Sequence, residues 1–98
     1  MNLPLVFHPD VQGEVGSAYQ WYEQQRAGLG DDFLAALEGV YAGLQTTPAM
    51  HQVIYRDVRR ALLRRFPYAV YYRAHPDRVE VLAVQHTRRD PSGWQTRA

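Results

Sequence analysis

Hydrophobic residues in the first half of the chain recur with the period of an α-helix. One apolar stripe has spacings of three and four residues and consists of Val11, Val15, Ala18, Tyr19 and Tyr22. A second stripe with similar spacing consists of Leu29, Phe33, Leu37, Val40 and Leu44. The pattern predicts two amphipathic helices, the first reaching about Gln25 and the second ending before Pro48. The connection carries Gly28 and Gly30 and is only a few residues long, which predicts an antiparallel pair packed stripe to stripe.

Two glycines weaken the first of these helices. Gly13 and Gly16 lie inside its apolar pattern. A glycine costs on the order of 1 kcal/mol relative to alanine inside a helix. We therefore expect that packing against another element compensates, or that the first turn is loose.

The hydrophobic pattern changes on both sides of the helix pair. Leu3–Phe7 is a short apolar run followed by His8 and Pro9, which predicts a strand that leads into the first helix. After Gln52 the runs are short and rich in β-branched, aromatic and leucine residues, which is typical of strands. These runs are Val53–Val58, Arg60–Arg65, Tyr68–Ala74 and Arg78–His86. Turns are predicted at Phe66-Pro67, as a hairpin turn without chemistry, and at His75-Pro76-Asp77.

The order of these elements predicts an α+β fold. An amino-terminal strand and a two-helix antiparallel hairpin would pack on a mostly antiparallel sheet of three or four strands, in two layers. With 98 residues, the chain forms one domain over residues 1–98. Tyr68, Val70 and Tyr72 share one strand face, which we expect to pack on the helices, leaving Tyr71 and Arg73 outside. We expect Trp94 to close over the sheet as a lid.

Charge divides the chain into two unequal halves. Residues 1–51 carry one arginine against six acidic residues, a net charge of −5, and residues 52–98 carry ten arginines against four acidic residues, a net charge of +6. The chain has no lysine. Guanidinium groups bind phosphate and carboxylate through flat, forked contacts, so the basic half predicts either nucleic acid or an acidic partner protein as its receiver. The alternative is a solvated arginine-rich face without a partner.

Several classes of site are not expected. Cysteine is absent, and the histidines at 8, 51, 75 and 86 lack the paired spacing of metal ligands, so we expect no disulfide, metal site or cofactor. No apolar run approaches the ~20 residues of a membrane span, and residues 3–7 lack a basic leader and a cleavage site. We expect a cytoplasmic chain with no membrane partner.

Three segments of the second half form a distinctive series. They are Arg64-Arg65-Phe66-Pro67-Tyr68-Ala69-Val70-Tyr71-Tyr72-Arg73, Asp77-Arg78-Val79-Glu80-Val81-Leu82-Ala83-Val84, and His86-Thr87-Arg88-Arg89-Asp90-Pro91-(x)2-Trp94. With the short length and the element order, this series resembles the RelE/ParE superfamily of bacterial toxins, often labelled plasmid-stabilisation proteins. The resemblance implies a growth-arresting toxin of a type II toxin–antitoxin pair, neutralised by a cognate antitoxin protein encoded beside it.

The superfamily divides by target. The resemblance implies either a ParE-like inhibitor of DNA gyrase or a RelE-like endonuclease that cleaves mRNA in the ribosome. The ribonuclease branch typically has a Gly-Tyr-Arg setting at the central strand and lysines on the strand before it. Here Ala69 follows Tyr68 and lysine is absent, so the sequence favours gyrase.

If the chain is an enzyme, it is an mRNA endoribonuclease, and its candidate residues can be named. Histidine is the residue type whose side chain can titrate near neutrality, so His86 is the candidate base or acid for this task. Arg65, Arg88 and Arg89 would stabilise phosphate charge, and Tyr71 or Tyr72 would stack on a base. The structural alternative is that His86 ends a strand and hydrogen-bonds locally to Asp90 or a carbonyl.

For a toxin that acts by binding, the candidates lie on the sheet. The side chains expected to contact the target or the antitoxin are Arg59, Arg60, Arg64, Arg73 and Trp94. An acidic antitoxin segment would match the basic half, and an exposed sheet edge would accept it as an added strand. A third alternative is a partner-binding module that is not toxic.

Overall fold

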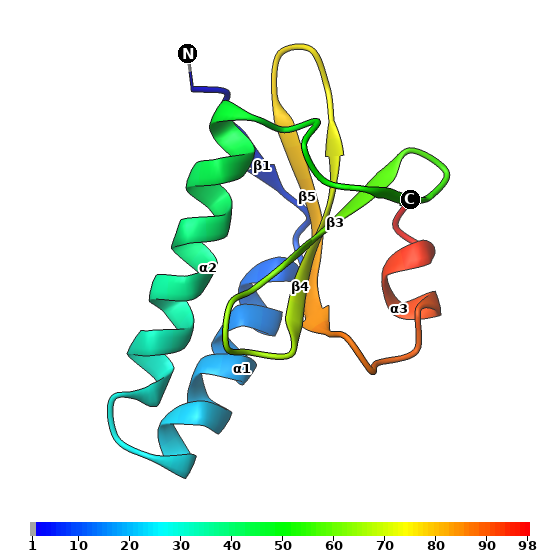
Figure 1. Cartoon of the computed structure of the whole chain (residues 1–98). Helices are drawn as coiled ribbons and strands as arrows, with labels where there is room; N and C mark the ends of the chain where they lie inside the picture. The colour runs from blue at the N-terminus through cyan, green and yellow to red at the C-terminus, as the bar shows by residue number, and fades with distance from the viewer. Residues whose placement is uncertain (1) are drawn as a thin grey trace.

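The computed structural model describes residues 2–98, which fold in three layers (Figure 1). Helices α1 (Val11–Gln25) and α2 (Leu29–Thr46) form one layer, a five-stranded sheet forms the second, and the short helix α3 (Ser92–Gln95) covers the other sheet face. The strands are β1 (Leu5–Phe7), β2 (Val53–Tyr55), β3 (Val58–Leu62), β4 (Tyr68–Ala74) and β5 (Val79–His86). In the described chain no helix is both long and apolar enough to cross a membrane.

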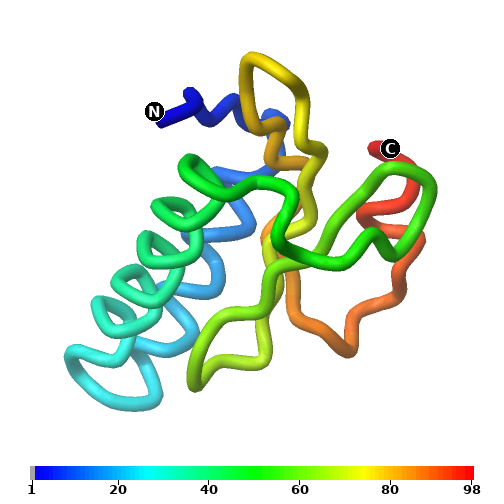
Figure 2. The backbone as a smooth tube through the Cα atoms, turned by 45° about the horizontal axis from the view of Figure 1, so that its top comes forward, coloured from blue at the N-terminus to red at the C-terminus, as the bar shows by residue number. Residues whose placement is uncertain are grey.

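The sheet confirms the α+β prediction. Its order is β1-β5-β4-β3-β2, and every neighbouring pair is antiparallel except β1 and β5, which run parallel with Leu5 opposite Val79. The expected three or four strands become five because β1 joins the four later strands. Figure 2 shows the chain passing from the helix pair to the β2–β3 hairpin and then through β4 and β5 to the carboxyl end.

The predicted boundaries of β2 and β3 were wrong. The chain turns at Arg56 and Asp57, inside a run that had been assigned to a single strand, and Arg56 takes a positive φ of 53°. β3 ends at Leu62 rather than Arg65, because the chain turns there and Arg65 has a φ of 71°. Neither turn has the glycine or asparagine that usually marks such a conformation, so the pattern gave no sign of them.

The two helices are joined by a tight connection that depends on two glycines. Gly28 has a φ of 89°, which a side chain would disfavour. At Gly30, a Cβ would lie 2.8 Å from the ring of Tyr19, so α1 and α2 approach closely only because this residue has no side chain. The Glu23 carboxylate accepts hydrogen bonds from both amide groups at 2.9–3.1 Å and satisfies the start of α2.

The main core lies between the helices and the inner face of the sheet. Tyr22 and Phe33 stack with ring centroids 5.4 Å apart, and Phe66 and Tyr68 pack edge-on against them. Val70 and Tyr72 are fully buried in the same core. The prediction that Tyr68, Val70 and Tyr72 face the helices is confirmed.

Candidate functional site

The far side of β3 leaves a short stretch of sheet uncovered. β2 pairs with β3 only as far as Arg59, and the Arg60 amide donates to the Gln52 carbonyl at 3.2 Å. The Leu63 amide donates to the Tyr68 carbonyl, so the backbone amides of odd-numbered residues in this stretch point toward β4. The amide of Leu62 therefore points away from β4, at a position beyond the end of β2. This stretch of backbone is available for a further strand.

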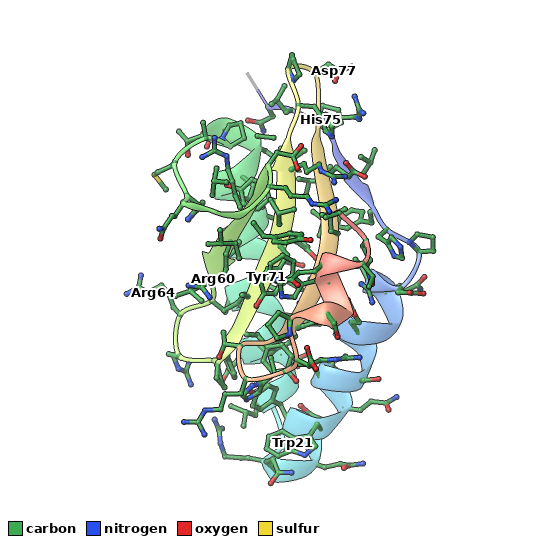
Figure 3. All side chains as sticks on the ribbon, turned by 90° about the vertical axis from the view of Figure 1, so that its right-hand side faces the viewer. Trp21, Arg60, Arg64, Tyr71, His75 and Asp77 are labelled. Carbon is green, nitrogen blue, oxygen red and sulfur yellow. The ribbon has the colours of Figure 1, made fainter. Side chains whose placement is uncertain are left out.

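This stretch carries two arginines and a leucine, and we call Arg60, Leu62 and Arg64 the open edge. The Leu62 side chain is 57% exposed, although it belongs to a strand. Both arginines are exposed, and within residues 2–98 neither forms an ion pair. Figure 3 shows Arg60 and Arg64 near the same edge of the sheet, where Arg60 lies opposite Tyr71 and Arg64 also borders a depression against α2. An apolar side chain between two exposed arginines that form no ion pair suits an acidic, partly apolar segment.

The other arginines expected to bind a target hold the fold together. Arg59 donates to the carbonyl groups of Ala49 and His51 at 3.0 and 2.7 Å and fastens the loop after α2. Arg73 donates to Asp57 at 2.8 Å, which raises the pKa of Arg73 and lowers that of Asp57. Both guanidinium groups are therefore committed within the chain.

Tyr71 and Trp94 form a closed stack on the outer face of the sheet. Their ring centroids are 4.5 Å apart with the planes 13° from parallel, and both residues are buried. Burial raises the pKa of Tyr71. The lid predicted for Trp94 is confirmed, whereas the exposure expected of Tyr71 was wrong because α3 covers it. Neither ring is exposed for stacking on a base or for a partner, in contrast to the roles considered for them from the sequence.

His86 lies beside a cleft at the end of β5, where it is opposite Tyr68. The cleft, of about 660 Å³, is bordered by α1, the ends of β4 and β5 and the carboxy-terminal segment, and we call it the histidine cleft by its side chains Trp21, Tyr68, His86 and Arg89. Trp21 is 55% exposed. The imidazole packs edge-on against Tyr68 at 5.4 Å, and its Nδ1 accepts the amide of Arg88 at 3.1 Å, not a bond from Asp90. Sequence reasoning missed Trp21, whose position on α1 gave no link to His86.

The remaining phosphate-binding candidates do not all reach this cleft. Arg89 lines it, and Arg88 is exposed in the loop that follows β5. Arg65 lies in the turn before β4, over the ring of Phe66 and 3.9 Å from Asp32. Asp90 accepts the amide of Ser92 at 2.9 Å, which lowers the pKa of this carboxyl and fixes the start of α3.

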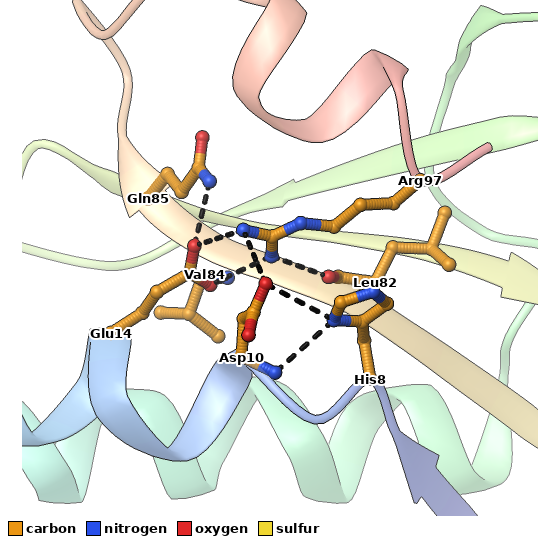
Figure 4. A network of polar contacts seen from close by, with 7 residues as sticks. All are labelled: His8, Asp10, Glu14, Leu82, Val84, Gln85 and Arg97. Carbon is orange, nitrogen blue, oxygen red and sulfur yellow. Dashed lines mark hydrogen bonds and ion pairs between the residues drawn. The ribbon is translucent and has the colours of Figure 1, made fainter.

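A buried cluster of polar groups closes the inner wall of the histidine cleft (Figure 4). The Glu14 carboxylate accepts hydrogen bonds from the Val84 amide, from the Gln85 amide group and twice from Arg97, at 2.7–3.2 Å. Arg97 also donates to the Leu82 carbonyl at 2.9 Å and lies 3.6 Å from Asp10. We call Glu14, Gln85 and Arg97 the carboxy-terminal clasp. Its partners lie about seventy or more residues apart, so no spacing in the sequence could predict it.

The carboxy-terminal clasp leaves one atom without a partner. Gln85 is 2% exposed, and its Oε1 has no hydrogen-bond partner among residues 2–98, whereas its Nε2 donates to Glu14 at 2.7 Å. A Cβ at Gly93 would lie 3.2 Å from this oxygen. The oxygen therefore points under α3 and not into the histidine cleft.

The arrangement offers binding surfaces more readily than a centre for proton transfer. His86 is the one imidazole that lines the histidine cleft, and Glu14 in the same lining is committed to four hydrogen bonds. Across residues 2–98 no three histidine, cysteine or acidic side chains are grouped as metal ligands.

Comparison with known proteins places these features in a family. Residues 5–91 match the family model described as the ParE toxin of type II toxin–antitoxin system, parDE. Among solved structures, the fold is similar to a chain of a chromosomal ParDE toxin–antitoxin system from P. aeruginosa, with 15% sequence identity, 86% of this chain and 95% of that chain covered, and a TM-score of 0.75. No curated protein matches the chain.

Proposed function

Because the chain belongs to the family of ParE toxins of type II toxin–antitoxin systems, we propose that it arrests bacterial growth by binding DNA gyrase, without cutting a nucleic acid. The ParE-like branch that the sequence resembles blocks this enzyme. The toxin would act by occupying a surface of gyrase, so no base, acid or metal is required of it.

The observation that carries this proposal is the dispersal of the ribonuclease candidates. Cleavage by a 2′-hydroxyl needs a base, an acid and charge stabilisation around one phosphate. Tyr71 is buried under Trp94, Arg65 is paired with Asp32, and Glu14, which lines the cleft with His86, is committed to four hydrogen bonds. Docking does not need these groups to converge.

The open edge is the surface that we propose for the antitoxin. Its exposed backbone would accept an extended segment, Leu62 would pack against an apolar side chain, and Arg60 and Arg64 would pair with carboxylates. Through the same arginines the toxin would contact its target, so the antitoxin neutralises the toxin by competing for them.

One observation favours the ribonuclease as a second candidate. The histidine cleft joins the exposed indole of Trp21 with His86 and Arg89. An exposed aromatic ring beside a cation can stack on an unpaired base next to a phosphate. In this alternative the cleft would hold single-stranded mRNA.

A single experiment separates the two. The purified toxin and its His86→Ala variant are added to gyrase in a supercoiling assay and to translating ribosomes in an mRNA-integrity assay. We expect both proteins to inhibit supercoiling equally and to leave mRNA intact. Normal supercoiling at saturating toxin would refute the gyrase proposal. If the unchanged toxin cleaves mRNA and the His86→Ala variant leaves it intact, the ribonuclease would be established instead. In a separate expression test, unimpaired growth with verified soluble expression would indicate a module that is not toxic.

A further inference from the structure

The helix pair carries an apolar groove that the proposed toxin action does not use. One part, of about 560 Å³, lies between the start of α1 and the middle of α2 and includes Phe7, Val15, Leu34 and Tyr41. A neighbouring part of about 390 Å³ shares Val15 and Leu34 and continues to Tyr19. The two parts run between the helices as one depression.

The wall of this groove is mainly apolar. Phe7 is 48% exposed and meets Tyr41 edge-on at 5.4 Å, so an aromatic pair stands at one end. Burial raises the pKa of Tyr41 to about 12. From Asp31 to Tyr41 the groove follows α2 for roughly 15 Å, the length of about three helical turns. A partner helix of that length would fit along it.

Gly16 borders the groove without a side chain that would project into it. No atom lies within 4 Å of the position that a Cβ would take there. The packing expected to compensate for this glycine is therefore not supplied by residues 2–98. A helix from another molecule could approach the backbone of α1 at this point.

The charge of the rim identifies the kind of helix. Glu38 borders one part of the groove and Asp31 the other, and no arginine or lysine borders either. Glu38 forms no ion pair among residues 2–98. The surrounding half of the chain has a net charge of −5. A partner with cations beside its apolar stripe would complement this rim, and one with carboxylates would be repelled.

From these observations we propose that the acidic groove, lined by Phe7, Val15, Leu34, Tyr41, Asp31 and Glu38, docks a cationic amphipathic helix of a partner protein. The partner helix lays its apolar stripe over Val15 and Leu34 and directs its lysines or arginines to Glu38 and Asp31. The toxin therefore has two docking surfaces of opposite charge, the open edge for an acidic segment and the acidic groove for a basic helix.

Two synthetic helices test this proposal on the intact protein. Both are fluorescein-labelled peptides of about 14 residues with the same leucine stripe, flanked by lysine in one and by glutamate in the other. We expect fluorescence anisotropy to show that the lysine helix binds roughly tenfold or more tightly, with the preference shrinking as salt rises. Glu38→Lys should reduce or reverse the preference. Equal binding of both helices, or no binding of either, would overturn the proposal.

A matched pair of glycine variants locates the site. Gly16→Arg fills the groove with a cation, whereas Gly13→Arg places the same group on α1 facing the histidine cleft. Both changes replace a helix glycine with open space beside it, so both should leave the fold at least as stable as before. We expect Gly16→Arg to weaken the lysine helix at least tenfold and Gly13→Arg to leave it within about twofold. Equal affinities of the two variants for the lysine helix would contradict the assignment. A dimer of the free protein that Gly16→Arg dissociates would also contradict it, because a second copy of the chain would then occupy the groove. Neither result bears on gyrase inhibition, which is measured separately.

Discussion

The backbone amides and carbonyls at the two sides of the sheet differ in whether side chains of the same chain cover them. Beyond the end of β1, strand β5 is closed by side chains, since Glu14 accepts the Val84 amide and Arg97 donates to the Leu82 carbonyl. Beyond the end of β2, strand β3 has no such cover, and Leu62 is 57% exposed. One side is sealed from within the chain and the other is left open.

The difference indicates which side is made for a partner. Unpaired strand edges invite aggregation, and proteins usually block them. This chain blocks one edge with a nearly buried ion pair and leaves the other beside two exposed arginines. An edge left open in a protein that can close edges is best explained by a binding partner that covers it.

The largest effect should come from unsealing the closed side. The side chains of Arg97 and Glu14 are 13% and 11% exposed, so Arg97→Ala leaves a carboxylate without its charge partner in a mostly buried site. We expect the free energy of unfolding to fall by ~3–5 kcal/mol, measured by urea denaturation. Arg88→Ala removes an exposed arginine nearby and should cost less than about 0.5 kcal/mol.

The fluorescence of Trp94 reports the same change locally. In a Trp21→Phe background, Trp94 is the remaining tryptophan and lies against Tyr71. We expect Arg97→Ala to shift its emission to the red, because the segment that carries α3 loses its anchor. Unchanged stability and emission would mean that the carboxy-terminal clasp does not seal this edge.

The next effect concerns the open side and should appear in binding rather than in stability. Arg60→Glu combined with Arg64→Glu reverses two exposed, unpaired charges. We expect the affinity for the antitoxin to fall roughly 10- to 100-fold, while the midpoint of thermal unfolding changes little. The matched control reverses Arg88 and Arg89, which lie in the loop after β5. Equal losses for the two pairs would show that overall charge, and not the open edge, governs binding.

The smallest effect should be a pH dependence at the turn that leads into the open edge. The hydrogen bond from Arg73 lowers the pKa of Asp57, so the folded carboxylate stays charged at a pH where the unfolded one is protonated. The resulting stabilisation is present above the unfolded pKa and is lost as pH falls through the folded pKa. Because Asp57 is exposed, we expect only a slightly shallower loss of stability in Asp57→Asn below about pH 4. Parallel stability curves for the two proteins would contradict this contribution.

Local pattern was sufficient to predict most of the fold. The helix stripes gave α1 and α2, and alternation along β4 gave the face that Val70 and Tyr72 bury. The turn at Arg56 was missed because a residue without a glycine's freedom adopts a positive φ there. Periodicity detects which side of an element is apolar, and it does not detect a turn of this kind.

The functional surfaces were predicted less completely, for a physical reason. Arg60 and Arg73 are alike in sequence, yet Arg60 is exposed and forms no ion pair within residues 2–98, whereas Arg73 is paired with Asp57. Tyr71 was placed on the correct face, but its cover, Trp94, comes from a helix over twenty residues later. Whether a side chain is available depends on long-range contacts, which no local pattern contains.

The most direct test of the open edge follows two amide groups by hydrogen exchange. In the free toxin, the Val84 amide is protected by Glu14, and the Leu62 amide, directed outward, should exchange quickly. When the antitoxin is added, the account predicts that Leu62 becomes protected while the exchange of Val84 changes little. Antitoxin binding that leaves Leu62 unprotected, or a Leu62 amide already as protected as Val84 in the free toxin, would contradict it.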